Sequence, residues 1–246
     1  MKLLAVIPHY NHVHTVGKVA QAMQAFGIDC LIVDDGSDDA AITALQQLSL
    51  AGTEVIYRAQ NGGKGAAVKD GIRYAALHGY THVLQVDADA QHCLADTQKL
   101  VAAAVAQPQA VVCGRPVYGA DTPKARLYGR KVTNFWLAVN TLSLDIKDGM
   151  CGFRIYPLAP TIDVIDGEYI GNYMDFDAEL LVYLHWRGCA FVWIDTPVTY
   201  ASDGISHFRV WQDNILISRM HARLFIKMLW HAPGLLWRRR QRKVHD

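Results

Sequence analysis

Short apolar runs alternate with longer stretches of helical periodicity through the first half of the chain. The runs are short enough for buried strands and lie at residues 3–7, 30–33, 54–57, 82–86 and 110–113. Between them, apolar positions recur at helical spacing over residues 13–26, 40–48, 64–77 and 94–106. This alternation predicts an α/β fold with a mostly parallel sheet and helices on both of its faces.

The second half is less regular. Its patterns predict helices over 125–142, 176–186 and from 208 to about 230, and strands over 152–156 and 191–194. No repeat, low-complexity segment or linker separates the two halves. We therefore expect one domain over residues 1–210. Residues 211–246 would form an amphipathic, basic C-terminal helix that is not an independent domain.

Composition narrows the class of protein. The chain has 246 residues, of which 51% are hydrophobic and 19% charged, as in a globular protein with a sizeable core. It shows no signal-peptide pattern and no apolar run of about 18 residues that would span a membrane. Five widely spaced cysteines without a CxxC pair argue against a zinc site and favour a reducing, cytoplasmic location.

Charge is unevenly distributed. The net charge is +1, yet residues 205–246 hold nine Lys/Arg and only two Asp/Glu. This asymmetry predicts an anionic partner for the tail, either phosphate groups or a membrane surface.

Two carboxylates follow the fourth apolar run, one residue apart, at Asp87 and Asp89. Residues i and i+2 of an extended chain point to the same side, so both carboxylates can aim at one point beyond the strand. With the amide of Gln91 close by, this set of oxygen donors suits Mg²⁺ or Mn²⁺. Taken alone, the motif would also fit a solvated turn.

Polar or flexible residues also follow the first three runs. The segments are Pro8–Asn11, Asp34–Asp38 and Asn61–Gly65. The carboxyl ends of parallel strands share one edge of the sheet, where α/β proteins bind ligands. Asp34 or Asp35 can accept hydrogen bonds from a base or a ribose, and Lys64 suits a phosphate or a sugar hydroxyl. The segment around Lys64 is not a Walker A loop, since no Ser/Thr follows the lysine, and no dinucleotide fingerprint follows the first strand.

Together these motifs resemble the family 2 glycosyltransferases, in the branch of the dolichyl- and polyprenyl-phosphate sugar transferases. The matching segments run in order over about residues 1–210 and are 6–11, 33–38, 61–67, 87–92, 114–115 and 148–154. The resemblance implies a Rossmann-like nucleotide-sugar-binding sandwich of the glycosyltransferase A type. It also implies a nucleoside-diphosphate sugar donor and a divalent metal. His12 stands where the family usually has an acidic residue, so the base contact at that corner stays open.

The resemblance also implies roles for single residues. The donor-binding residues would be Pro8, Tyr10, Asp35, Lys64, Asp87, Arg115 and Arg209. Asp87, Asp89 and Gln91 would hold the metal, and His207 would stabilise charge on the leaving diphosphate together with Arg209. A loop followed by a basic helix start would explain Arg209 equally well.

The acceptor side depends on what is glycosylated. If the acceptor is an alcohol, Asp177 is the first candidate for the general base and Asp175 the second. A phosphate acceptor is already anionic and needs no base, so Asp177 would then be structural or position a sugar hydroxyl. Favourable charge at a helix N-terminus is the simpler alternative for both residues.

Trp and Leu lie beside dense Arg/Lys from Arg219 to Lys243. This composition is typical of an interfacial helix on anionic lipid. A helix packed on the core, or a dimer contact, are the alternatives. Nucleic acid is not expected, because the charge is terminal and the polar site fits a small ligand.

We therefore expect an inverting, metal-dependent glycosyltransferase of the hexosyltransferase class. It would transfer a sugar to a lipid or polyprenyl-phosphate acceptor at the inner face of the cytoplasmic membrane. Two alternatives remain. A sugar nucleotidyltransferase would need a glycine-rich basic loop after the first strand, which Pro8–Asn11 is not. The other alternative is a non-catalytic nucleotide-sugar-binding or membrane scaffold protein.

Overall fold

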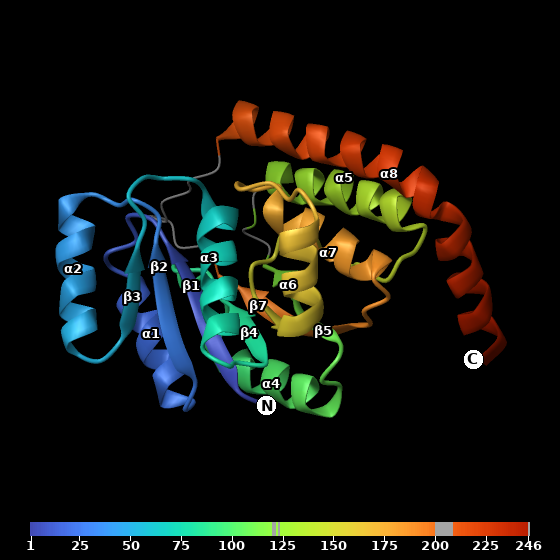
Figure 1. Cartoon of the computed structure of the whole chain (residues 1–246). Helices are drawn as coiled ribbons and strands as arrows, with labels where there is room; N and C mark the ends of the chain where they lie inside the picture. The colour runs from blue at the N-terminus through green and yellow to red at the C-terminus, as the bar shows by residue number, and fades with distance from the viewer. Residues whose placement is uncertain (120–121, 123, 200–208, 246) are drawn as a thin grey trace.

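The computed structural model describes residues 1–119, 122, 124–199 and 209–245, and Figure 1 shows their arrangement. A seven-stranded sheet of order β3-β2-β1-β4-β6-β5-β7 forms the centre. The strands are β1 (Leu3–His9), β2 (Asp29–Asp34), β3 (Glu54–Tyr57), β4 (His82–Gln85), β5 (Val111–Tyr118), β6 (Arg154–Pro157) and β7 (Phe191–Val198). Only β6 runs antiparallel to its neighbours among these strands, so the predicted mostly parallel sheet is confirmed.

Helices cover both faces of the sheet. They are α1 (Val16–Ala25), α2 (Asp39–Leu50), α3 (Lys64–Leu77), α4 (Thr97–Ala106), α5 (Lys124–Thr141), α6 (Leu158–Gly167), α7 (Phe176–Trp186) and α8 (Val210–His245), with a 3₁₀ turn η1 (Leu94–Asp96) before α4. One buried cluster joins the sheet to α3, α6, α7 and α8, and a second joins its other face to α1 and α4. The sandwich therefore has the two cores that a two-sided α/β sheet requires.

Several elements differ from the sequence prediction, among them α6, β5 and α8. Helix α6 was not predicted, because Pro160 interrupts the pattern, although proline is tolerated in the first turn of a helix. Strand β5 continues past the polar Arg115, because its backbone pairs with β7 as far as Tyr118 and Val198. Helix α8 continues beyond residue 230 despite Pro233, and Figure 1 shows it changing direction in its second half.

The long helix α8 packs against α5 and α7. Its buried apolar side chains belong to the same core cluster as those of α7, and they are Ile217, Met220, Leu224, Met228 and Leu235. Among the residues in the structure, no helix combines the length and apolarity needed to cross a bilayer.

The sheet brings several polar segments to one edge. Strands β1, β2, β3 and β4 are mutually parallel, and β5 and β7 run in the same direction because β6 is antiparallel to both β4 and β5. All six carboxyl ends therefore meet at the same edge. Figure 1 shows α3, α5 and α8 beginning on that side of the molecule.

Candidate active site

Lys64 joins two carboxylates that come from distant parts of the chain. It is the first residue of α3, and its Nζ lies 2.7 Å from Asp87 Oδ1 and 2.9 Å from Asp177 Oδ2. Burial alone would lower the pKa of the Lys64 amine, but the charges of Asp177 and Asp87 outweigh burial and raise it. Lys64 therefore stays positively charged and fixes the two carboxylates next to each other.

A buried network holds Asp177 from its other side. Gln85 Nε2 donates to Asp177 Oδ1 at 2.7 Å, and Tyr156 donates from its hydroxyl to Gln85 Oε1 at 3.3 Å. The fully buried Arg154 donates from Nη1 to the backbone oxygen of Asp177 at 2.8 Å. Both oxygens of the Asp177 carboxylate thus contact protein groups.

Sequence reasoning missed Gln85, Arg154 and Tyr156 as members of this network. A signal existed, because Gln85 interrupts an otherwise apolar strand and a buried amide must find hydrogen-bond partners. The sequence does not reveal that the partner is Asp177, which lies 92 residues further along the chain.

The carboxylates of Asp87 and Asp89 influence each other. Burial alone would raise the pKa of Asp87, but the charge of Lys64 and the nearby His92 outweigh burial and hold the pKa far below its usual range. Burial raises the pKa of Asp89, and the charge of Asp87 raises it further. Asp89 Oδ1 accepts a hydrogen bond from the backbone N–H of Gln91 at 3.0 Å, which closes the turn after β4.

These residues fit a divalent cation. Lys64 and Arg154 supply two positive charges, whereas Asp87, Asp89 and Asp177 supply three negative ones, so Asp89 carries the uncompensated charge. Among the residues that the structure describes, no group of three or more His, Cys, Asp or Glu side chains is arranged to hold a metal ion. The protein ligands would be two carboxylates and the Gln91 amide, which suits a metal that takes its other ligands from phosphates.

His92 lies next to the same carboxylates, and sequence reasoning assigned it no role. Its ring stacks on Phe153 with centroids 5.2 Å apart, and its Nε2 lies 3.6 Å from Asp87 Oδ2. Phe153 belongs to the segment 148–154, so this segment borders the turn that holds Asp87 and Asp89. Gly152 is the closest point, because a Cβ there would lie 2.4 Å from Asp87 Oδ1 and 2.5 Å from Lys64 Nζ.

The corner after β1 and β2 is held by hydrogen bonds within the protein. His12 donates from its backbone N–H to His9 Nε2, so His9 Nδ1 carries the proton that is shared with Asp34 over 2.9 Å. Burial alone would raise the pKa of Asp34, but hydrogen bonds from His9 and Ser37 outweigh burial and lower it. Pro8 is buried in β1, and Tyr10 is half-buried at the end of that strand.

Asp35 holds the glycine loop in front of α3. Its carboxylate accepts hydrogen bonds from the backbone N–H groups of Gly62 at 3.0 Å and Gly63 at 2.7 Å, and it pairs with Arg58. Gly63 has φ = 97°, and a Cβ there would lie 2.4 Å from the backbone oxygen of Asn172. Only glycine fits this conformation and approach, so the loop is fixed by backbone constraints.

The remaining predicted residues lie outside the Lys64 cluster. Asp175 accepts a hydrogen bond from the backbone N–H of Tyr173, in the turn before α7, and the guanidinium of Arg209 lies 5.2 Å from the Tyr173 ring. Arg115 pairs with Asp195 on the exposed surface of β5 and β7. His207 lies outside the described residues. The roles of all these residues stay predictions.

Residues 4–161 match the model of the glycosyl transferase family 2. The chain belongs to this family. It is therefore a glycosyltransferase, and the resemblance found in the sequence motifs is confirmed.

Two curated relatives are similar over most of the chain. A polyprenol monophosphomannose synthase of Mycolicibacterium smegmatis is 28% identical over 213 residues, which cover 81% of this chain and 77% of the relative. An undecaprenyl-phosphate mannosyltransferase of Micrococcus luteus is 29% identical over 178 residues, which cover 68% of this chain and 70% of the relative.

The fold is also similar to that of a solved glycosyltransferase. The crystal structure of glucosyl-3-phosphoglycerate synthase from Mycobacterium tuberculosis, in complex with Mn²⁺ and uridine-diphosphate-glucose, aligns with a TM-score of 0.67. The alignment covers 92% of this chain and 78% of that one at 17% sequence identity. The predicted glycosyltransferase A type of fold is confirmed.

Replacing Lys64 with methionine is expected to leave Asp87 and Asp177 facing each other without the cation that lies between them. We expect the free energy of unfolding to fall by about 2–3 kcal/mol, because an uncompensated buried charge is costly. The double variant Lys64→Met/Asp177→Asn should recover part of that loss. Urea unfolding of the single and double variants measures the coupling. Additive effects of the two changes would contradict the proposed role of Lys64 as the bridge.

Proposed function

We propose that this glycosyltransferase transfers a hexose from a nucleoside-diphosphate sugar to a polyprenyl phosphate, with inversion and with a divalent metal. The observation that carries the proposal is the excess negative charge at Asp87 and Asp89, next to the cationic Lys64, at the edge where the strands end. The relatives named for mannosyl transfer to polyprenol or undecaprenyl phosphate support this acceptor class. The neighbour solved with Mn²⁺ and uridine-diphosphate-glucose supports the donor class and the metal.

Different residues of this chain would bind the metal, the diphosphate and the nucleoside. Asp87, Asp89 and Gln91 would hold Mg²⁺ or Mn²⁺, which when bound stabilises the charge that develops on the leaving diphosphate. Lys64 is held in place by Asp177 and adds a positive charge beside the same position. Pro8, Tyr10 and Asp35 would line the pocket of the nucleoside.

A phosphate acceptor gives Asp177 a positioning role. A phosphate oxygen is already anionic and needs no general base. The two carboxylate oxygens of Asp177 contact Lys64 and Gln85, which suits a residue that orients Lys64. Arg115, Arg209 and His207 would then meet the phosphates of the donor or the acceptor.

The acceptor class also suggests where the reaction takes place. We propose that the protein works as a peripheral protein on the inner, anionic surface of the cytoplasmic membrane. The basic character of residues 205–246, with nine Lys/Arg and two Asp/Glu, supports this placement.

Nucleoside-diphosphate sugars are expected to stabilise the protein against heat, with a larger effect when Mn²⁺ is present. A ligand at 100 times its Kd adds about 2.7 kcal/mol to the free energy of unfolding. Thermal unfolding with a panel of donors, each with and without Mn²⁺, measures the effect. The donor with the largest shift is then incubated with polyprenyl phosphate, and formation of the glycosylated lipid is followed. If no donor shifts the unfolding temperature, the proposed donor site is wrong.

A further inference from the structure

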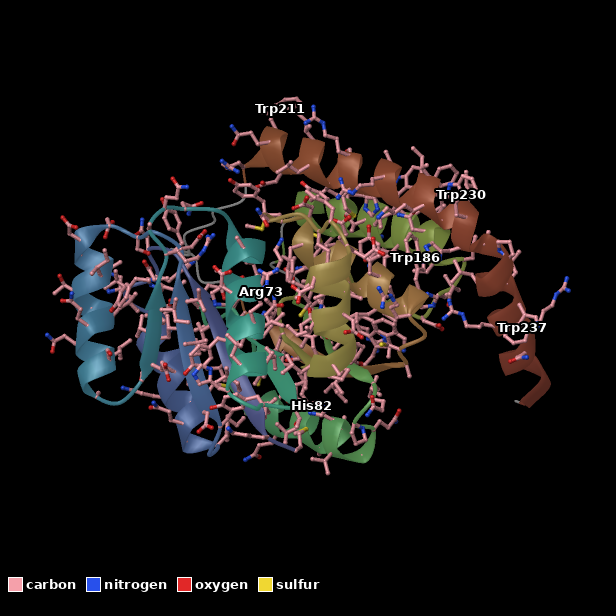
Figure 2. All side chains as sticks on the ribbon, in the orientation of Figure 1. Arg73, His82, Trp186, Trp211, Trp230 and Trp237 are labelled. Carbon is pink, nitrogen blue, oxygen red and sulfur yellow. The ribbon has the colours of Figure 1, made fainter. Side chains whose placement is uncertain are left out.

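Helix α8 has large apolar side chains on two opposite sides. One side packs into the core, as described above. On the other side, Trp211, Ile215, Ile226, Leu229 and Trp230 follow spacings that place them together on a helix. Trp211 is 81% exposed and Trp230 is 85% exposed. Figure 2 shows both on the outer side of α8, whereas Trp186 lies beneath the helix.

Helix α5 continues this apolar surface. Tyr128, Val132 and Phe135 are separated by three or four residues and are exposed, Tyr128 to 68% and Phe135 to 63%. The ring of Trp136 meets that of Phe225 on α8 in an edge-to-face contact, with centroids 6.3 Å apart. The two helices are in contact, and their apolar strips adjoin at this pair of rings. We call the exposed apolar residues of both helices the α5–α8 face.

The charge of helices α5 and α8 indicates which partner would bind the α5–α8 face. Helices α5 and α8 together contain twelve Lys/Arg and one Asp/Glu, whereas the rest of the chain contains twelve and twenty-two. Three of the twelve pair with acids of neighbouring segments, Arg130 with Asp148, Arg223 with Glu179 and Lys227 with Glu168, and the others leave the two helices with an excess of basic residues. The single acid, Asp213, is buried. Lys131 and Arg219 are exposed on the two helices. A second copy of this chain would place one basic face against another, whereas an anionic lipid surface would complement it.

The position of the face agrees with a lipid substrate. Helices α5 and α8 begin after strands β5 and β7, whose carboxyl ends lie at the same edge of the sheet as Asp87. A bilayer covering the outer side of these helices would therefore begin beside the proposed transfer site. Aromatic side chains with an apolar body and a polar tip are well suited to that boundary.

We propose that the α5–α8 face docks on an anionic bilayer, with its aromatic side chains inserted among the lipid headgroups and its basic residues pairing with anionic lipid. This inference rests on the proposed function, because it explains how the protein would reach a polyprenyl phosphate in a bilayer. Large exposed apolar patches mark interaction sites in globular proteins, and the exposed aromatic and aliphatic side chains gathered on these two helices point to such a site.

The test is sedimentation with lipid vesicles of phosphatidylcholine, with or without about a quarter of phosphatidylglycerol. The wild-type protein should bind the anionic vesicles and bind neutral ones far more weakly. Phe135→Ser/Trp230→Ser should lower the affinity for anionic vesicles at least about tenfold, because exposed aromatic area is lost. The control Leu77→Ser/Val105→Ser removes two exposed apolar side chains from α3 and α4 and should bind as the wild type does.

The electrostatic part has its own variant. Lys131→Glu/Arg219→Glu should lower the affinity for anionic vesicles at least about tenfold, since each basic residue near the surface contributes to binding. The control Lys18→Glu changes an exposed lysine on α1 and should have no effect. Thermal unfolding of each variant, with and without donor and in the absence of lipid, reports folding and donor binding separately.

The outcomes separate the two proposals. Unchanged vesicle binding by Phe135→Ser/Trp230→Ser, or no binding by the wild type, would overturn the docking proposal and leave the donor site untouched. So would a wild-type dimer in sedimentation that these substitutions convert to a monomer. Vesicle binding without any donor-dependent stabilisation would support the face and refute the proposed function.

Discussion

Replacing Asp89 with asparagine is expected to lower the rate of sugar transfer by at least about 10²-fold, the loss seen when one preorganised electrostatic contact to a transition state is removed. Asp89 carries the negative charge that Lys64 and Arg154 leave uncompensated, and its Oδ1 accepts a hydrogen bond from the backbone N–H of Gln91. Asparagine preserves the shape of the side chain and removes the charge that a divalent cation requires. The measurement is the initial rate of transfer at saturating donor with varied Mn²⁺.

Metal binding gives the Asp89 prediction an independent readout. Stabilisation by Mn²⁺ in thermal unfolding should disappear in Asp89→Asn and persist in Asp163→Asn, which changes an exposed acid on α6. Because the pKa of Asp89 is raised, protons should compete with the metal at a higher pH than for an ordinary carboxylate. Stabilisation of the wild type by Mn²⁺ should therefore weaken as the pH falls. Equal rates and equal metal effects in both variants would contradict the assignment of Asp89.

Replacing Arg223 with leucine is expected to lower the free energy of unfolding by about 3–4 kcal/mol. Arg223 on α8 pairs with Glu179 on α7 through two nitrogens, with Nη2 at 2.7 Å from Oε1 and 2.8 Å from Oε2. The Glu179 carboxylate is fully buried and also accepts a hydrogen bond from the backbone N–H of Gly171 at 2.9 Å. The substitution would leave a buried charge without its cation, which is far more costly than losing an exposed pair.

The double variant Arg223→Leu/Glu179→Gln should recover most of the loss, because glutamine removes the charge and can still accept from Gly171. Arg73→Leu is the matched control, since Arg73 forms an exposed pair with Asp166. Exposed pairs contribute about 0–1 kcal/mol, so this control should unfold almost as the wild type does. Urea unfolding of the wild type and the three variants measures these differences in the free energy of unfolding. A loss in Arg223→Leu no larger than that in Arg73→Leu would show that the pair does not anchor α8.

The Arg223–Glu179 pair also connects α8 to the first turn of α3, which carries Lys64. Gly171 belongs to the segment before α7, whose Asn172 accepts a hydrogen bond from the backbone N–H of Ala66 in the first turn of α3. Lys69 Nζ donates to the backbone oxygen of Ile170 at 2.9 Å. Helix α8, which carries part of the α5–α8 face, and helix α3, which begins with Lys64, are thus connected through residues 170–172.

The alternation of strands and helices could be predicted because it depends on local periodicity. The bounds of β3, α3 and α7 agree with the sequence patterns, since their apolar positions decide which face is buried. Helix α6 could not be found in this way, because Pro160 hides a helix that packs against α3 and α7. Burial of its apolar side chains against these two helices, rather than local periodicity, determines that α6 forms.

The candidate site divides in the same manner. That Asp87, Asp89 and the segment around Lys64 lie near one edge follows from the rule for parallel strands. That Lys64 bridges Asp87 and Asp177 depends on where α7 packs. Likewise, Arg115 meets Asp195 because β5 pairs with β7 in a particular register, with these two residues opposite each other.

By itself, the sequence predicted the mostly parallel α/β sheet, the family and the sheet edge where the polar motifs meet, since hydrophobic period and the succession of motifs along the chain are local properties. Only the tertiary structure decided which acidic and basic side chains form ion pairs, and which side of α8 is exposed. Both depend on contacts between residues far apart in the chain. The energy of a buried ion pair or an exposed aromatic side chain is set by the three-dimensional surroundings, and a linear pattern does not contain them.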